Sequence, residues 1–514
     1  MNLATDAKGH RPRVSWPTFL SLVAIFFTAA IPFVLTLALT SPQSHDEDQH
    51  IAAGALVARE GLLPYRDFPC LHTPNLALLY GVIFRETDYL MLSARLVSAA
   101  SAAAIVGLVA AIAWAAFRNR GRIVAWLAAV GAAVLCLFSK SFATTTGLAW
   151  NQELSLLLAL VAGVTLWIGV RDGKPGWLFV AGLFAGLAIG TRVTYAPLLA
   201  PFGLTVLFGG PRELGKIVSR VCWFCGGCVV GFLPVIVLWT LAPEAAKFGI
   251  LDFAKANIDY RVATGEPRTM TFLKKVRFFF KEIVREDFPL YLAALIPFAA
   301  VMFVLRRRLS LVLWYLLVLL PFVLWGAMAP SPLFDQYFYP FAPFLTLCAV
   351  ASLSALPWDR KHLLWVPVLC GIMAVLSIVR VAEEYGKMDR LEEAEDWTPI
   401  EQHETGRDYR RIVGDGRVLT LAPAVAVEGG MPIYPEFAAG PFAWRVSEYV
   451  DPGKAARIGL VTPHTLPALL QKSPPAAVVL QAEKGLENEF RAWVESRRFA
   501  PVRASDGHDI WRLK

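Results

Sequence analysis

Long apolar blocks separated by short polar segments dominate the chain as far as about residue 380. Blocks such as Phe19–Thr40, Ile123–Ser139 and Leu309–Ala329 continue for roughly 20 residues without a charged side chain, which is the length that crosses a bilayer as an α-helix. The pattern predicts an all-α polytopic membrane protein. No small-residue cleavage pattern follows the first block, so we expect a retained span and not a signal peptide.

The apolar blocks predict about 11 membrane helices. In chain order they are Trp16–Thr40, Tyr89–Phe117, Ile123–Lys140, Gln152–Val170, Trp177–Gly190, Tyr195–Phe208, Val221–Leu241, Leu290–Leu305, Leu309–Ala329, Phe338–Leu356 and Leu363–Ala382. Lys and Arg cluster between alternate spans, and such clusters mark the cytoplasmic side. The clusters are Lys8–Arg13, Arg118–Arg122, Arg171–Lys174, Arg212–Arg220, Arg306–Arg308 and Arg360–Lys361. We therefore expect a cytoplasmic N-terminus and an extracytoplasmic C-terminus.

Three segments on the predicted outer side, residues 41–88, 242–289 and 383–514, are too long for simple turns. The first includes Thr73–Phe84, which is too short to span and indicates an interfacial helix or an extension of the second span. The second contains FLKKVRFFFKEIVRE, whose apolar residues alternate with cations at helical spacing. It predicts either an amphipathic helix on the outer surface or an ordinary solvated helix.

The pattern changes to short mixed elements after residue 382, so we expect a transmembrane domain over 1–382 and a small extracytoplasmic α/β domain over 383–514. Its apolar runs predict strands over Arg417–Val427, Ala476–Leu480 and Ile510–Leu513. The helical spacing of Leu486–Arg498 predicts a helix between the second and third of these strands. The domain has no phosphate loop, GxSxG or zinc-type spacing, so nothing in it indicates catalysis.

Composition excludes a soluble enzyme. Of the 514 residues, 56% are hydrophobic and only 18% are charged, whereas soluble proteins average about 25% charged. The net charge of +8 reflects the orientation of the spans and is not evidence of nucleic-acid binding. We therefore expect contact with membrane lipid and no nucleic-acid partner.

An acidic cluster, Asp46-Glu47-Asp48, follows the first predicted span, and Ile51–Arg59 after it has the pattern of a helix. On a helix, Asp46 and His50 share a face while Glu47 and Asp48 point away, so only one or two acids can face one pocket. The alternative is a solvated helix start, because acids favour a helix N-terminus.

Two consecutive spans, Trp177–Gly190 and Tyr195–Phe208, are short: about 14 residues gives roughly 21 Å against about 30 Å of hydrocarbon. Arg192 lies at their junction and is either an intramembrane cation in a substrate cavity or a side chain that reaches the outer interface. The small residues Gly182, Gly186 and Gly190 form a face on which a neighbouring helix can pack closely.

Two further groups lie on the same predicted side. Glu153 begins the fourth span within Asn151-Gln152-Glu153, and Gln336 and Tyr339 begin the tenth within Asp335-Gln336-Tyr337-Phe338-Tyr339-Pro340. Taken singly, such residues also serve as interfacial anchors or favour a helix N-terminus.

Four segments share their order and predicted side with one known family: Asp46-Glu47; Arg59–Tyr65 with Thr73-Pro74-Asn75; Gly186–Arg192; and Gln336–Pro343, where Gln336 replaces the usual Arg. In these segments the chain resembles the polyprenyl-phosphate-sugar-dependent glycosyltransferases of the C superfold (GT-C). The resemblance is greatest to the bacterial branch near the lipid A aminoarabinose and galacturonosyl transferases and the protein O-mannosyltransferases.

The resemblance implies a transfer of sugar from a polyprenyl-phosphate donor to a lipid, glycan or protein acceptor at the outer face of a bacterial inner membrane. Asp46 matches the catalytic carboxylate, with Glu47 beside it, and Arg192 would hold the lipid phosphate. The further substrate contacts implied are His72, Glu153, Gln336 and Tyr339. No cofactor is certain, and a divalent metal is left open because several acids face outward without metal-ligand spacing.

Two other classes compete with this interpretation. A transporter of a lipid-linked or anionic substrate would predict repeated halves and ionisable residues near the bilayer midplane, but the sequence has no visible internal repeat and its acids cluster at one face. A membrane scaffold that presents the C-terminal domain would explain neither the short helix pair nor the acids.

Overall fold

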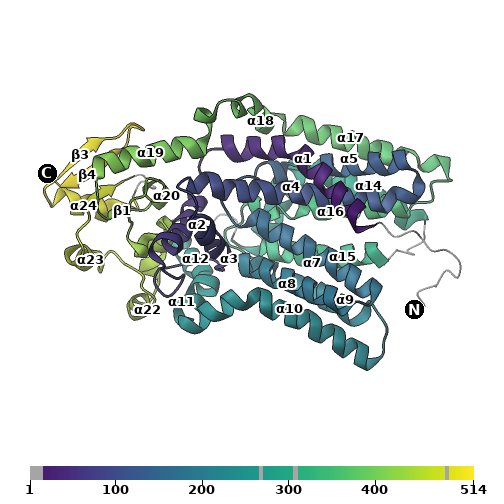
Figure 1. Ribbon diagram of the computed structural model, residues 1–514, viewed down its shortest axis with the longest axis horizontal. Helices are drawn as coiled ribbons and strands as arrows, with labels where there is room; N and C mark the ends of the chain where they lie inside the picture. The colour runs from purple at the N-terminus through teal and green to yellow at the C-terminus, as the bar shows by residue number, and fades with distance from the viewer. Residues whose placement is uncertain (1–14, 266–269, 305–310, 481–484, 514) are drawn as a thin grey trace.

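The structure, a computed structural model, describes residues 15–265, 270–304, 311–480 and 485–513. The apolar helices run roughly along the long axis of the molecule, and the strands lie together at one end (Figure 1). Two of the predicted basic clusters, Lys8–Arg13 and Arg306–Arg308, lie outside the described residues.

Six helical segments in the described ranges are long and apolar enough to cross a membrane. They are α1 (Trp16–Thr40), α4 (Leu90–Phe117) with η2 (Arg118–Arg120), α7 (Gln152–Asp172), α10 (Leu214–Leu241), η6 (Asp335–Phe338) with α16 (Phe341–Ala355), and η7 (Lys361–Leu363) with α17 (Trp365–Arg380). A seventh candidate is bent by 93° between α13 (Phe272–Phe278) with η5 (Phe279–Val284) and α14 (Phe288–Val304).

Shorter apolar helices occupy the other predicted spans. They are α5 (Arg122–Leu137), α8 (Pro175–Thr191), η3 (Val193–Leu198) with α9 (Leu199–Phe208), and α15 (Leu311–Met328). All of the predicted apolar blocks are therefore helical, but the count of about 11 membrane crossings stays a prediction, because length and composition alone support six or seven.

The short pair predicted around Arg192 is present as α8 and η3–α9, and Arg192 between them has extended backbone angles, φ −152° and ψ 114°. The small residues of α8 pack as predicted. A Cβ atom on Gly182 or Gly186 would lie 2.0 or 2.3 Å from a carbonyl oxygen of α10, and Gly227 and Gly231 of α10 approach α8 equally closely. Small residues at such contacts allow helix backbones to approach closely within a membrane.

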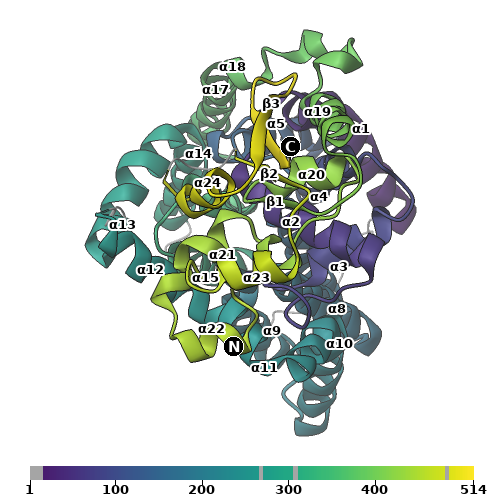
Figure 2. The same cartoon turned by 90° about the vertical axis from the view of Figure 1, so that its left-hand side faces the viewer.

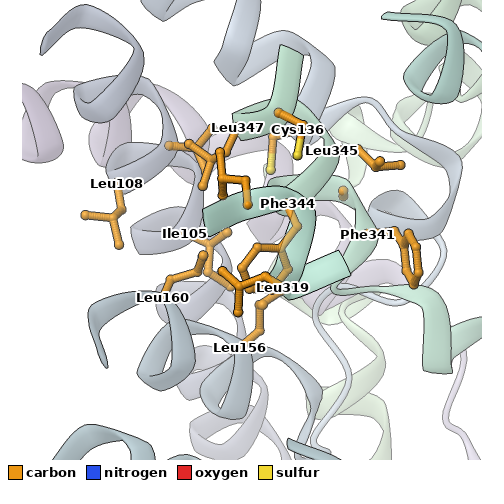
Figure 3. Close-up of a cluster of buried hydrophobic side chains, with 14 of the residues drawn as sticks. Ile105, Leu108, Cys136, Leu156, Leu160, Leu319, Phe341, Phe344, Leu345 and Leu347 are labelled. Atoms are coloured by element: carbon orange, nitrogen blue, oxygen red, sulfur yellow. The ribbon is translucent and has the colours of Figure 1, made fainter. Parts of the chain in front are cut away.

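The main apolar core lies between α4, α5, α7, α15 and α16 (Figure 3). The side chains labelled there are Ile105, Leu108, Cys136, Leu156, Leu160, Leu319, Phe341, Phe344, Leu345 and Leu347. Side chains on every face of α16 are buried and mostly apolar, and most of that helix lies inside the bundle. A helix that is apolar all round is typical of such a central position.

Short helices gather at the end of the bundle where α1 finishes (Figure 1). They are α2 (His45–Ala55), η1 (Leu56–Glu60), α3 (Asn75–Ile83), α6 (Lys140–Ala143), α11 (Pro243–Lys247), η4 (Phe248–Asp252) and α12 (Phe253–Ala263). The C-terminal elements lie across α2 and α3 in the view along the bundle (Figure 2), and the buried apolar residues of both groups form one cluster.

We call residues 398–513, as far as they are described, the C-terminal unit. Its helices are α19 (Thr398–Val413), α20 (Pro423–Glu428), α21 (Pro441–Val446), α22 (Pro452–Arg457), α23 (Leu466–Lys472) and α24 (Asn488–Glu495), preceded by α18 (Ala382–Tyr385). Its strands are β1 (Val418–Thr420), β2 (Ala477–Val479), β3 (Phe499–Arg503) and β4 (Asp509–Leu513). They form one sheet in the order β1-β2-β4-β3, with β1 and β2 parallel and the other neighbours antiparallel.

The sheet differs from the prediction in two places. The apolar run Arg417–Val427 is a strand only over β1, because Pro423 starts the helix α20. Strand β3 was not predicted. It contains Pro501 and lies at the sheet edge, where proline is tolerated. Whether this unit is a separate domain outside the membrane stays a prediction.

Candidate active site

The acidic cluster Asp46-Glu47-Asp48 lies in the first turn of α2, whereas the sequence predicted a helix that starts after it. The hydroxyl of Ser44 accepts a hydrogen bond from the backbone N–H of Asp46 at 3.3 Å, and the backbone N–H of Ser44 donates to Glu47 Oε2 at 2.9 Å. This reciprocal arrangement is a capping box, which satisfies N–H groups at a helix start. The helix expected over Ile51–Arg59 therefore begins earlier, at His45, and continues into η1.

Glu47 is fully buried in an ion pair with Arg95 of α4. Arg95 Nε and Nη2 donate to the two carboxylate oxygens at 2.8 and 2.7 Å, and both side chains have 0% exposure. The backbone N–H of Ala149 donates to the same carboxylate at 2.7 Å. These contacts occupy Glu47, so the geometry favours a positioning role for it in place of the predicted catalytic one.

Asp46 lies one position earlier on α2 and is partly exposed. Its Oδ2 accepts a hydrogen bond from Gln336 Nε2 at 3.2 Å, so two residues predicted from separate segments of the sequence are in contact. Burial raises the pKa of Asp46 above its ordinary value, and the positive charges of Arg445 and Arg192 oppose that rise. A carboxylate with a raised pKa is a more effective general base near neutral pH.

Arg192 is held in place by several partners. Nη1 donates to Asn151 Oδ1 at 2.5 Å and Nε donates to Thr194 Oγ1 at 3.0 Å. The amide oxygen of Gln152, in the orientation that suits both groups, accepts from Nη1 and Nη2 at 2.9 and 3.1 Å. The guanidinium carbon lies 5.3 Å from the ring centroid of Tyr337. A cation fixed by neutral groups keeps its full charge available to a ligand.

A cavity adjoins Arg192, with about 340 Å³ of empty space that includes some open solvent. Polar side chains of Gln152, Arg192 and Thr194 line one part of it, and apolar residues of η3 and α15, among them Leu198 and Phe322, line another. One cation beside an apolar wall suits a ligand that has an anionic head and a hydrocarbon portion.

The second cation near Asp46 comes from the C-terminal unit and was missed by sequence reasoning. Arg445 is on α21; its Nη2 donates to Asn257 Oδ1 of α12 at 3.1 Å, and its guanidinium carbon lies 4.7 Å from the ring centroid of Phe442 and 5.7 Å from that of Tyr260. No local motif marks Arg445, because its position depends on how α21 packs against α12.

The other predicted contacts are distributed around the site. His72 stacks on His50, with ring centroids 5.1 Å apart and an interplanar angle of 28°. Glu153 accepts from the backbone N–H of Gly147 at 2.9 Å and, at 3.4 Å, from an indole in the same loop, so it orders the segment before α7. Tyr339 is fully buried and stacks on Phe142. Neither Glu153 nor Tyr339 lines the cavity, whereas Tyr195 and Tyr337 do.

The described residues contain no group of three or more His, Cys, Asp or Glu side chains that could hold a metal ion. The side chains around Asp46 are therefore a poor match to a divalent metal site.

Sequence comparisons give no match: no family model matches the chain, and neither does any curated protein. Solved structures do match. The structure of ArnT from Cupriavidus metallidurans bound to undecaprenyl phosphate overlaps 97% of this chain and 98% of its own, at 13% identity and a TM-score of 0.54. The apo form of that protein gives 14% identity and a TM-score of 0.44, with 96% and 98% covered.

The apo oligosaccharyltransferase of Archaeoglobus fulgidus also overlaps the chain, with 10% identity, a TM-score of 0.49, and 96% of this chain and 74% of that one covered. ArnT is an enzyme of GT-C fold. The chain therefore has the GT-C fold, as the sequence resemblance implied. Its apolar helices and this fold make it a multi-pass membrane protein.

Proposed function

We propose that this protein is a glycosyltransferase that moves a sugar from a polyprenyl-phosphate donor to an acceptor nucleophile. The observation that carries the proposal is the pairing of a partly buried carboxylate, Asp46, with the fixed cation Arg192 beside a partly apolar cavity. The GT-C fold supports the pairing, because ArnT with that fold was solved with undecaprenyl phosphate bound.

In the proposed reaction, Asp46 accepts the proton of an acceptor hydroxyl as its oxygen bonds to the anomeric carbon of the sugar. The bond between that carbon and the phosphate oxygen breaks at the same time, and polyprenyl phosphate leaves with an added negative charge. Arg192 stabilises this charge, since a preorganised cation in a poorly solvated site acts more strongly than water does.

Each neighbouring group has a distinct part in this scheme. Gln336 donates to Asp46 and orients its carboxylate. The Glu47–Arg95 pair fixes the start of α2 against α4. Arg445 adds positive charge near Asp46 and so favours its ionised form.

We infer that the site opens to the extracytoplasmic side of a bacterial inner membrane. The support is the distribution of Lys and Arg between the apolar blocks, which is the pattern expected if the end of the bundle bearing α2, α12 and the C-terminal unit lies outside. Accessibility of single cysteines introduced into this end, in whole cells and in inverted vesicles, tests the orientation.

Substitution of Asp46 tests the chemistry. Asp46→Asn keeps the shape and the Gln336 contact but removes the base, so we expect at least a hundredfold loss of sugar transfer in vesicles at unchanged protein abundance. A radiolabelled polyprenyl-phosphate sugar is the donor. The matched control is Asp88→Asn, whose side chain is 90% exposed and which should retain activity.

Two results would contradict the proposal. Retained transfer by Asp46→Asn would place the base elsewhere. Movement of the labelled donor across the vesicle membrane without its consumption would favour a transporter.

A further inference from the structure

The helical segment 272–286 consists of α13, η5 and the two residues that follow them, and α13 lies at the outer edge of the molecule in the view along the bundle (Figure 2). The segment meets α14 at a bend of 93°. Since α14 packs along α16 and α17 in the bundle, the segment runs across the direction of the apolar helices. A helix with this orientation can lie along a membrane surface.

The segment lies at the end of the bundle that bears α6, and its inner face is fixed there. Lys275 is 7% exposed, and its Nζ donates to carbonyl oxygens at the end of α15, including that of Met328 at 2.8 Å. Ile283 is buried in the main apolar core, and the ring centroid of Phe279 lies 5.4 Å from that of Phe338. At the bend, Asp287 accepts from the backbone at the start of α6. These contacts hold the helix without using its outer face.

Four exposed cations form a stripe along that outer face: Lys274, Arg277, Lys281 and Arg285. They are three or four positions apart, so they lie on one side of the helix. Lys281 contacts Glu282 at 3.8 Å, whereas the other three have no carboxylate within ion-pair distance among the described residues. The stripe therefore carries positive charge that the described part of the chain does not neutralise.

Large apolar side chains flank the stripe and are also exposed. Leu273 and Phe280 are seven positions apart and so lie on one side of it, with 78% and 63% of their surface exposed, and Phe272 at the helix start is 76% exposed. Four cations would be costly in hydrocarbon, and a contiguous apolar patch is unusual in water. Both sets of side chains are accommodated at the boundary between headgroups and acyl chains.

We propose that segment 272–286 is an interfacial anchor that binds the phosphate headgroups of anionic phospholipids in the surrounding membrane. The cation stripe matches the phosphates, and Leu273 and Phe280 match the acyl chains beside them. An acidic protein or a nucleic acid would neutralise the cations but would leave the apolar flank exposed. The anchor does not depend on sugar transfer, so it goes beyond the proposed function.

Lipid binding to the detergent-purified full chain tests the anchor. Native mass spectrometry counts the lipids bound during titration with phosphatidylglycerol, which is anionic, or with phosphatidylcholine of the same acyl chains. We expect the wild type to bind phosphatidylglycerol at least tenfold more tightly, because each cation beside anionic lipid strengthens binding by about fivefold. Equal binding of the two lipids overturns the inference.

A triple variant removes the three cations that have no carboxylate nearby: Lys274→Gln, Arg277→Gln and Arg285→Gln. We expect it to bind phosphatidylglycerol at least tenfold more weakly and phosphatidylcholine as the wild type does. The matched control removes three exposed cations of the C-terminal unit, Lys472→Gln, Arg491→Gln and Arg498→Gln, and should bind both lipids normally. An equal loss in the control would mean that net charge alone determines binding, which overturns the inference.

Two more variants separate lipid binding from folding. The charge-preserving triple variant Lys274→Arg, Arg277→Lys and Arg285→Lys should bind phosphatidylglycerol as the wild type does. Arg277→Gln alone should weaken that binding by about fivefold, and it replaces the triple glutamine variant if thermal unfolding shows that variant to be unstable. Normal phosphatidylglycerol binding by Arg277→Gln and by the triple glutamine variant contradicts the anchor.

Undecaprenyl phosphate is the last probe, because it too has an anionic head and a hydrocarbon chain. Its phosphate is assigned to Arg192, so the triple glutamine variant should bind it normally. Loss of undecaprenyl phosphate binding with unchanged phosphatidylglycerol binding would assign the stripe to the donor and overturn the inference. Selective phosphatidylglycerol binding by a protein that transfers no sugar contradicts the proposed function but supports the anchor.

Discussion

Asp46 and Glu47 are consecutive on α2, yet their carboxylates have opposite surroundings. Glu47 is fully buried and accepts four hydrogen bonds, from the backbone of Ser44 and Ala149 and from two nitrogens of Arg95. Within the described part of the chain, Asp46 accepts one, from Gln336. A carboxylate with unoccupied acceptor positions can take a proton from a substrate, which suits Asp46 to its proposed role as the base, whereas the contacts of Glu47 suit a structural role.

Glu47→Gln should destabilise the protein. The substitution leaves the Arg95 charge buried without its counterion, which typically costs about 3–5 kcal/mol. We expect a lower thermal unfolding temperature in detergent and less folded protein in the membrane, whereas Asp46→Asn should change neither. Normal stability of Glu47→Gln would mean that Arg95 finds another partner.

The pH dependence of sugar transfer should report Asp46. Below its pKa the carboxyl is protonated and cannot act as a base, so kcat/KM should fall on the acid side at a pH above the ordinary aspartate value of about 4. Arg445→Gln removes a charge that lowers this pKa, and the acid limb should therefore move to still higher pH.

The control for this shift is Arg457→Gln, because Arg457 is on the neighbouring α22 and is 60% exposed in an ion pair with Glu244. It should leave the pH profile unchanged. An unshifted acid limb in Arg445→Gln would mean that the charge of Arg445 does not affect the pKa of Asp46.

Site residues could be predicted from the sequence only where a local pattern marked them. Arg192 was marked by the short apolar blocks on either side of it, and Asp46 by an acidic cluster beside a span. Arg95 could also have been predicted, because a cation inside an apolar block requires an acidic partner. Arg445 carried none, because only the packing of distant elements brings it near Asp46.

At the scale of elements, helices were predictable and strands were less so. Apolar length sets a membrane helix almost by itself, so most of the predicted blocks agree with the helices within a few residues; α10 is the exception, since it begins at Leu214 and not at the predicted Val221. The strands are only three to five residues long, and their pairing joins segments about 60 residues apart, as in β1 and β2. An apolar run of three residues has no periodicity that distinguishes the strand β1 from the helix α20 that follows it.

Close packing of α8 on α10 gives a test at this scale. In Gly186→Ala the new methyl group would lie 2.3 Å from the carbonyl oxygen of Cys228, so the helices must separate, and we expect a loss of about 1–3 kcal/mol. Gly203→Ala in α9 is the control, because nothing lies within 4 Å of the added atom. Thermal unfolding should show Gly186→Ala less stable and Gly203→Ala equal to or slightly more stable than wild type.

At the scale of the molecule, the C-terminal unit is fixed to the bundle through polar contacts, of which those of Glu428 are buried. Glu428 of α20 accepts from the backbone N–H groups of Leu90 and Met91 at 3.1 and 3.0 Å, which are the first residues of α4. His403 of α19 contacts the same carboxylate at 3.1 Å. On the other side, Lys454 of α22 donates to Asp252 at 2.7 Å.

Glu428→Ala should loosen this docking. The substitution leaves two N–H groups at the start of α4 without their acceptor, at a cost of roughly 1–3 kcal/mol. We expect faster limited proteolysis between the bundle and the C-terminal unit, together with lower sugar transfer as Arg445 moves from Asp46. Glu404→Ala, at a site 56% exposed on α19, should change neither. An unchanged proteolysis rate in Glu428→Ala would contradict this role.

The position of Arg445 in the chain also has a consequence for synthesis. A ribosome makes every apolar helix of the bundle before it reaches residue 445. A nascent chain with all of those helices inserted already holds Asp46 and Arg192, but the charge balance around Asp46 is still incomplete. Catalytic competence is therefore expected to arise late, when the last part of the chain has folded back onto the first.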